Sequence, residues 1–65
     1  MNAVIGEAAG TIWHYLDKNG EASVNKVTTE TGLSKNDVQR GIGWLAKEDK
    51  ISIETNGRVE TLSLK

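Results

Sequence analysis

The sequence predicts an α+β fold in which three helices precede a C-terminal β-hairpin. Three observations support this fold class. Apolar residues recur at helical spacing before Ile51 and alternate with polar ones from there on. The segment Gly32-Leu33-Ser34 joins a glycine suited to the end of one helix to a serine suited to the start of the next. Asn56-Gly57 then supplies the dipeptide most typical of a tight hairpin turn.

The first helix is predicted over residues 3–18, where an apolar stripe runs at helical spacing. The stripe consists of Ile5, Ala9, Ile12 and Leu16. Trp13 and Tyr15 flank it on opposite edges, so the apolar arc is wider than one neighbouring helix needs. Either the other helices and the sheet cover this arc together, or part of it meets another chain. Asn19-Gly20 provides the turn at which the helix ends.

The second helix is predicted over residues 24–31. Ser23 is placed to cap its first turn, and the segment Glu21-Ala22-Ser23 before it is long enough only for an isolated extended bridge. Val24 and Val27 provide its inward face. Its threonines lower the helix propensity, so packing against the rest of the chain must hold this helix.

The third helix is predicted over residues 35–49 and is amphipathic. Ser34, with Asp37 three residues later, forms a capping box at its start. Ile42 and Leu45 point within about 40° of Val38 on a helical wheel. The opposite side carries two cations, an amide and a bare backbone, from Asn36, Arg40, Gly43 and Lys47. One face is therefore suited to a core and the other to a partner.

The hairpin is predicted from the alternation that begins at Ile51. Ile51 and Ile53 share one face of the first strand. With Asn56-Gly57 as the two central residues of the turn, Ile51 lies opposite Leu62 and Ile53 lies opposite Glu60.

Length and composition predict a single domain, residues 1–65, near the lower size limit for a self-supporting core. The chain has no cysteine, which excludes disulfides and thiolate metal sites. Either the core packs very efficiently or a second copy adds stability, so a homodimer is one expectation. There is no apolar run of about 18 residues to span a membrane. The first residues lack the features of a secretion signal, so we expect a cytoplasmic protein.

The charge balance bears on nucleic-acid binding. Eight lysines and arginines against nine acidic residues give a formal net charge of −1. Nucleic-acid modules usually carry excess positive charge, because much of their affinity comes from releasing counterions from phosphates. The total therefore argues against tight DNA binding, although a local cluster of cations can override it.

Catalytic and metal sites find little support in the sequence. His14, the only histidine, points away from the apolar stripe of the first helix and has no acidic residue at ligand spacing. We interpret it as a surface residue. Because cysteine and a Gly-rich phosphate loop are absent as well, we expect no enzymatic activity, no cofactor and no metal.

The order helix, short bridge, helix, turn, helix and hairpin resembles a winged helix-turn-helix domain over essentially the whole chain. The spacing that carries the resemblance runs through Gly32, Val38, Ile42, Leu45 and Ile51. The segments G-I-G-W-L-A-K-E-D-K-I and I-G-E-A-A-G-T-I-W are similar to a family of small, uncharacterised prokaryotic winged-helix proteins. One departure is Thr28, where such helix pairs commonly have alanine. A threonine there asks for slightly more room between the two helices.

The resemblance implies that the helix over residues 35–49 enters the major groove of double-stranded DNA with its N-terminus first. Arg40 would then bond guanine, and Asn36 and Gln39 would read adenine. Lysines beside this helix would approach phosphates, and Arg58 resembles the cation that winged helices insert into the minor groove. The implied function is that of a small transcription-associated regulator. Its DNA-binding residues would be Lys26, Lys35, Asn36, Gln39, Arg40, Lys47 and Arg58.

An alternative is a protein-interaction or self-association module, because the same fold serves that purpose without DNA contact. Trp13, Tyr15 and Trp44 would then be the anchors, since aromatic side chains dominate interface centres. Trp44 lies about 120° from the apolar stripe of its helix, so it either covers the edge of the core or awaits such a partner. Net charge favours this alternative, whereas the turn spacing and the layout of cations favour DNA binding.

Two glycines inside the third predicted helix indicate close approach by something else. Gly41 and Gly43 each destabilise a helix interior by about 1 kcal/mol relative to alanine. Gly41, near the apolar face, would admit the first helix or the Trp13 ring. Gly43, on the outward side, would admit a DNA backbone or another subunit.

Overall fold

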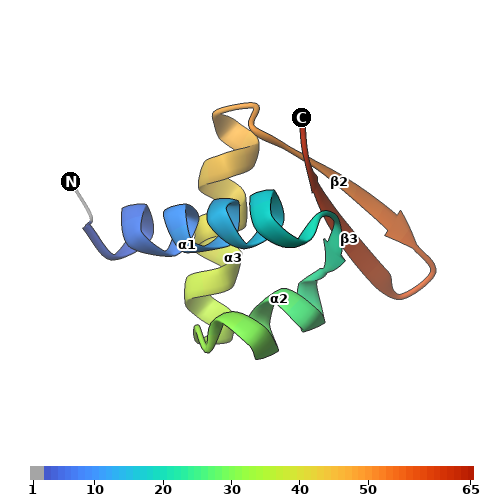
Figure 1. Ribbon diagram of the computed structural model, residues 1–65, viewed down its shortest axis with the longest axis horizontal. Coiled ribbons are helices and arrows are strands. Elements are labelled where there is room, and N and C mark those ends of the chain that lie inside the picture. Colours follow the sequence, from blue (N-terminus) through green and yellow to red (C-terminus); the bar gives the residue numbers. More distant parts are fainter. Residues whose placement is uncertain (1–2) are drawn as a thin grey trace.

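The computed structural model describes the backbone of residues 3–65 and the side chains of residues 6–65 (Figure 1). Its elements, in chain order, are α1 (Ala3–Asn19), β1 (Ala22–Ser23), α2 (Val24–Thr31), α3 (Lys35–Lys47), β2 (Ile51–Asn56) and β3 (Val59–Leu64). The predicted α+β class is confirmed. Ile5, predicted to belong to the apolar stripe of α1, lies outside the described side chains. Within the described residues, no helix has the length and apolarity needed to cross a membrane.

The turn between α2 and α3 follows the predicted chemistry. Gly32 has φ +74°, a left-handed conformation that glycine adopts without steric cost, and its N–H donates to Thr28 O at 3.2 Å. The Ser34 hydroxyl accepts the Asp37 N–H at 3.1 Å and so caps α3. Leu33 lies between the two helices, half-buried against the core. These bonds fix how α3 leaves α2.

The third helix ends at Lys47, two residues before its predicted end, because the chain turns left-handed at Asp49 (φ +59°). The Asp49 N–H donates to Ala46 O at 3.0 Å, and the Lys50 N–H donates to Leu45 O at 2.9 Å. This pair of bonds is the Schellman pattern that usually places glycine at the left-handed position. An ion pair between Asp49 and Lys65 accompanies the turn.

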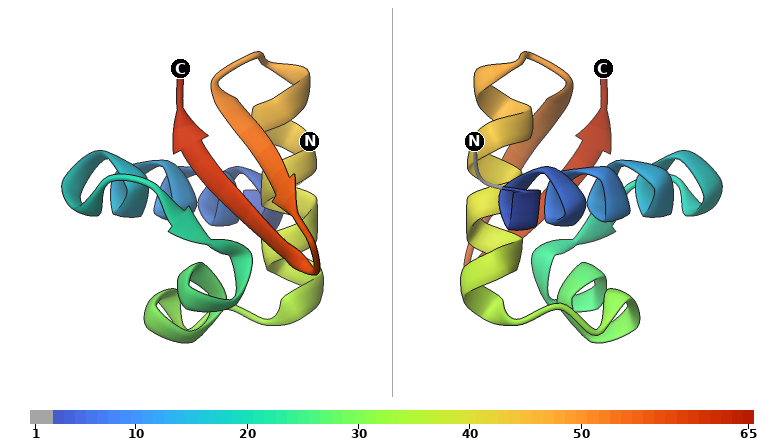
Figure 2. Two further views of the ribbon diagram at one scale, coloured as in Figure 1. Left: turned by 90° about the vertical axis from the view of Figure 1, so that its right-hand side faces the viewer. Right: turned by 90° about the vertical axis from the view of Figure 1, so that its left-hand side faces the viewer.

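The sheet contains three antiparallel strands in the order β1-β3-β2. The extended bridge predicted before α2 is β1, which pairs Ala22 with Leu62 and Ser23 with Thr61. The last strand of the chain is therefore the central one. The two views of Figure 2 place the hairpin at one end of the molecule and the start of α1 at the other.

The predicted register of the hairpin is wrong by two residues. Ile51 pairs with Leu64 rather than Leu62, and Ile53 pairs with Leu62 rather than Glu60. The reason is the turn: Asn56 pairs with Val59, so its central residues are Gly57 and Arg58. Gly57 has φ +65°, whereas Asn56 and Arg58 do not have positive φ. A two-residue turn with glycine at its first central position needs positive φ only there. The parity of the faces survives the shift, so Ile51 and Leu62 still share the buried side.

The core lies where α1 crosses α3 and where the sheet packs against the helices (Figure 1). Its largest fully buried side chains come from every helix and from the central strand: Ile12, Leu16, Val27, Val38 and Leu62. Ile42 and Leu45 are also buried, which confirms the predicted inward face of α3.

Gly41 marks the closest approach of α1 to α3. A Cβ atom at Gly41 would lie 2.8 Å from Ile12 Cδ1, 3.1 Å from the Ala9 nitrogen and 3.2 Å from the Ala8 carbonyl carbon. Of the two neighbours predicted for this glycine, the first helix is therefore the one that needs the space. A Cβ at Gly43 would meet nothing within 4 Å, so its outward surface is open.

Candidate nucleic-acid interface

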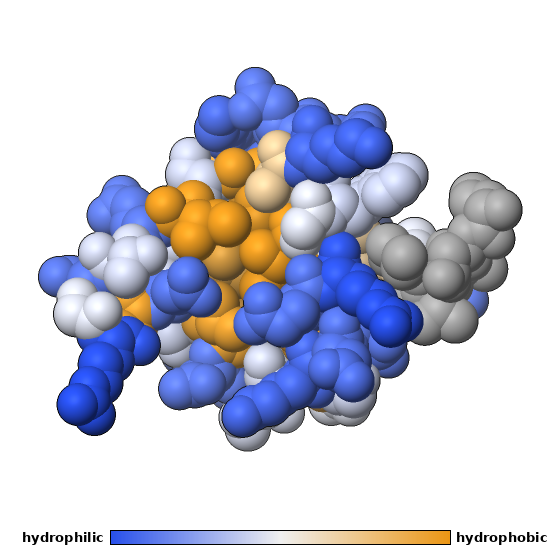
Figure 3. Space-filling model, turned by 180° about the vertical axis from the view of Figure 1, so that it is seen from behind, coloured by the Kyte–Doolittle hydropathy of each residue, from blue (hydrophilic) through white to orange (hydrophobic). Residues whose placement is uncertain are grey.

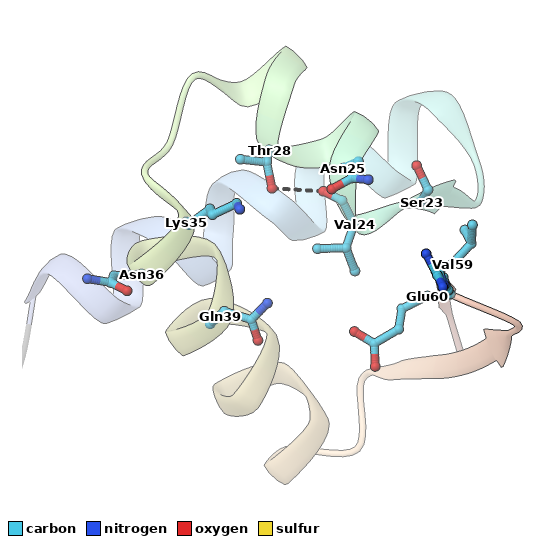
Figure 4. Close-up of a pocket in the computed structure, with 10 residues that line it drawn as sticks. Ser23, Val24, Asn25, Thr28, Lys35, Asn36, Gln39, Val59 and Glu60 are labelled. Carbon is cyan, nitrogen blue, oxygen red and sulfur yellow. Dashed lines mark hydrogen bonds between the residues drawn. The ribbon is translucent and has the colours of Figure 1, made fainter.

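A groove lies between the start of α2, the start of α3 and the tip of the hairpin. It is lined by Ser23, Val24, Asn25, Thr28, Lys35, Asn36, Gln39, Arg58, Val59 and Glu60. Figure 4 shows Lys35 and Gln39 on the α3 side, Val24 and Thr28 on the α2 side, and Glu60 reaching from the hairpin toward α3. Three separate segments thus contribute polar side chains to one depression.

Local structure explains why α3 presents these groups. The Ser34 cap sets the first turn, and Val38, with no exposed surface, fixes the inward direction of the helix. Lys35 and Gln39 then flank the groove, whereas Asn36 points away from the hairpin in Figure 4. The Thr28 hydroxyl donates to Val24 O at 2.8 Å and so satisfies its hydrogen bond within α2.

The structure brings together only some of the sequence-predicted DNA-binding residues. Lys35, Asn36, Gln39 and Arg58 line the groove. The other three, Lys26, Arg40 and Lys47, are exposed but outside it. Along α3, the open surface of Gly43 lies between Arg40 and Lys47, so an exposed strip continues from the groove toward the end of the helix.

The cations of this face make no salt bridge with the side chains described. Among the side chains of residues 6–65, the ion pair that the structure contains joins Asp49 to Lys65. Lys35, Arg40 and Arg58 are therefore not neutralised by direct contact with the acidic residues nearby in the sequence. They remain available for an external anion.

Sequence reasoning missed several groove residues, of which Glu60 and Asn25 carry chemistry. Glu60 brings a carboxylate into a groove that is otherwise cationic or neutral. Asn25 adds an exposed amide from the start of α2. The Ser23 cap, whose hydroxyl accepts the Lys26 N–H at 3.1 Å, was the signal that could have placed Asn25 in an outward first turn. Nothing comparable marks Glu60, because its position depends on the register of the hairpin.

The hairpin also exposes apolar side chains. Ile53 and Val59 are 42% and 49% exposed. Ile53 shares its face of the sheet with buried Leu62, so it extends the core outward rather than facing away from it. Figure 3 shows the molecule from behind the view of Figure 1. On this side an apolar area is ringed by polar side chains.

The three aromatic residues predicted as interaction anchors do not form one surface. Trp13 and Trp44 line a second groove between α1 and α3, and Trp44 is 45% exposed. Tyr15 is engaged elsewhere, since its hydroxyl donates to Glu30 Oε1 at 2.7 Å and so links α1 to α2. This hydrogen bond raises the pKa of Tyr15 above its ordinary value, because ionisation would break it beside a carboxylate. His14 is exposed, as predicted, and its ring meets Trp13 edge-on with the ring centres 5.5 Å apart.

The helix pair, its capped turn and the hairpin beside α3 define a winged helix-turn-helix domain. The chain belongs to the family described as winged helix-turn-helix domain (DUF2582), which it matches over residues 1–64. It is also similar to the uncharacterized protein MJ1608 of Methanocaldococcus jannaschii, with 41% identity over 64 residues, covering 94% of this chain and 90% of the relative. No solved structure matches the chain significantly.

Proposed function

We propose that the chain binds double-stranded DNA with the N-terminal half of α3 in the major groove and the hairpin tip against the neighbouring backbone. The observation that carries the proposal is the set of exposed cations without intramolecular partners on α3 and at the hairpin tip. The winged helix-turn-helix fold supports the same docking geometry, in which the second helix of the pair enters the groove. The role is binding, not catalysis, and we propose a small regulator of transcription.

Within this proposal, phosphate contacts and base contacts fall to different residues. Lys35, Lys47 and Arg58 carry long cationic side chains suited to phosphates, and Arg58 is one of the two central residues of the hairpin turn. Gln39 and Arg40 are exposed on the helix that would enter the groove, where they would read base edges. Glu60 opposes this arrangement, since its carboxylate would face the DNA.

The test is a titration of fluorescently labelled duplex DNA, followed by anisotropy at two salt concentrations. If about four cations meet phosphates, the slope of log affinity against log salt is about −3.6, so affinity falls about 100-fold between 50 and 200 mM salt. Arg58→Ala or Lys35→Ala should reduce the slope by about one. Lys50→Ala is the matched control, because Lys50 lines the groove between α1 and α3 instead. Absence of binding at about 20 mM salt, or an equal effect of the control, would contradict the proposal.

A second candidate function is self-association through the hairpin face. It is favoured by the exposed apolar side chain of Ile53, which shares its sheet face with buried Leu62, since apolar surface ringed by polar groups marks protein interfaces. Light scattering separates the two candidates when it is combined with the DNA titration. Ile53→Lys should convert a dimer to a monomer if this face joins two copies. The same substitution should preserve or strengthen DNA binding if the face meets phosphates, because it adds a cation there.

A further inference from the structure

The second groove, between the first half of α1 and the second half of α3, has the features of a small-molecule site. It encloses about 440 Å³ and is lined by Gly6, Ala9, Gly10, Trp13, His14, Trp44, Leu45 and Lys50. That volume falls within the roughly 300–1,000 Å³ of known ligand pockets. Both tryptophans of the chain lie here.

Two tryptophan side chains line this groove, and two glycines on its α1 side contribute no side chains. Trp44 is 45% exposed and so presents ring surface without cover from the chain. Gly6 and Gly10 leave the α1 side open, because a Cβ at either position would meet nothing within 4 Å. Two indole side chains lining one groove suit a flat ring system, since aromatic groups pair by offset stacking or edge contact.

One charged side chain, that of Lys50, lines this groove. Lys50 lies in it and makes no salt bridge with the described side chains, and His14 lies against the edge of Trp13. No acidic residue is among the lining residues. A ligand that combines a flat aromatic ring with an anionic group therefore matches both the two tryptophans and Lys50.

We propose that this groove binds a planar aromatic anion, with the ring between Trp13 and Trp44 and the anionic group at Lys50. The site contacts both α1 and α3 near their crossing point, where the absence of a side chain at Gly41 lets the two helices pack closely. A bound ligand therefore clamps the two helices and raises the melting temperature of the folded state, because it binds the folded chain and not the unfolded one. The proposal is independent of DNA binding.

The test uses naphthoate as the probe and naphthylmethanol as its uncharged counterpart, with NMR detection of the two indole N–H signals. Naphthoate should shift both signals saturably below about 1 mM, and naphthylmethanol should bind about tenfold more weakly, as expected for a lost charge-assisted hydrogen bond worth about 1.4 kcal/mol. At ten times the dissociation constant, naphthoate should raise the melting temperature by about 5 °C or more.

Three variants locate the site. Lys50→Gln should reduce naphthoate affinity to that of naphthylmethanol, whereas Lys47→Gln, the same charge change outside the groove, should leave it unaltered. Gly10→Leu should fill the groove and abolish binding while the chain still folds, because the added side chain enters open space. The proposal is overturned if naphthoate leaves the indole signals unmoved up to about 5 mM, or if Lys50→Gln and Gly10→Leu both bind like the wild type. Indole signals that shift with protein concentration alone would overturn it too, because a second copy would then occupy the groove.

Discussion

Two glycines two residues apart on α3 should respond oppositely to the same substitution. At Gly41, an added methyl group would lie 2.8 Å from Ile12 Cδ1 and 3.1–3.2 Å from the backbone of Ala9 and Ala8. Ile12 is fully buried, and the Ala8 and Ala9 atoms belong to the backbone of α1, which yields only if the helix shifts. At Gly43, the same methyl group would meet nothing within 4 Å.

The magnitudes follow from two opposing effects. Overpacking a dense core costs about 1–3 kcal/mol, and replacing glycine by alanine in a helix returns about 1 kcal/mol. Gly41→Ala should therefore destabilise the chain by up to about 2 kcal/mol, a fall in melting temperature of up to about 15 °C for a domain of this size. Gly43→Ala has only the favourable effect, so its melting temperature should rise by about 4–8 °C.

Thermal and urea unfolding followed by far-ultraviolet circular dichroism measures both changes. The two variants share one helix and one chemical change, so each is the control for the other. A Gly41→Ala variant that gains as much stability as Gly43→Ala would refute the assigned helix crossing. Shifts of equal sign in the two variants would show that helix propensity alone decides both.

Three further predictions concern a turn, a charge and a titrating group. Asp49→Gly should stabilise the chain by about 0.5–1 kcal/mol in urea unfolding, because glycine removes the left-handed strain at φ +59°. The substitution also removes the exposed ion pair with Lys65, which contributes little. A loss of stability would contradict this prediction. Glu60→Gln should tighten DNA binding severalfold in the anisotropy titration by removing a carboxylate from the groove, and unchanged affinity would place the DNA elsewhere. The pKa of Tyr15 is raised in the folded state, so the stability it contributes is present below its unfolded pKa of 10.0 and is lost as pH rises through the higher folded value. Unfolding measured on both sides of that range should show a decline that Tyr15→Phe reduces.

The features of the fold that depend on neighbours in sequence were predictable. Helix starts at Ser23 and Ser34 and the helix end at Gly32 rest on local hydrogen bonds, and all three occur as predicted. The end of α3 was missed because it uses aspartate where the left-handed position usually has glycine. The hairpin register was missed for a related reason. Asn56-Gly57 permits two turn placements, and only pairing with the rest of the sheet selects one.

The candidate interface was predictable one helix at a time but not as an assembled groove. Helical spacing placed Asn36 on the outside of α3, and the family resemblance added Lys35 and Gln39; all three are exposed in the structure. Which other residues line the groove beside them, including Glu60 and Asn25, depends on how α2 and the hairpin pack against α3. Pairwise packing of distant segments leaves no local pattern in a sequence. The aromatic residues show the same limit, because Tyr15 and Trp13 are close in sequence yet serve different contacts.

The strand order has a consequence for how the chain is made. Both outer strands find their partner in β3, which follows both of them along the chain. Until residues 59–64 have emerged from the exit tunnel, β1 and β2 have no strand to join, and Leu62 is missing from the centre of the core. The helices can form during synthesis, but the sheet closes only after β3 has emerged. Folding of this domain should therefore be completed only once residues 59–64 are outside the tunnel.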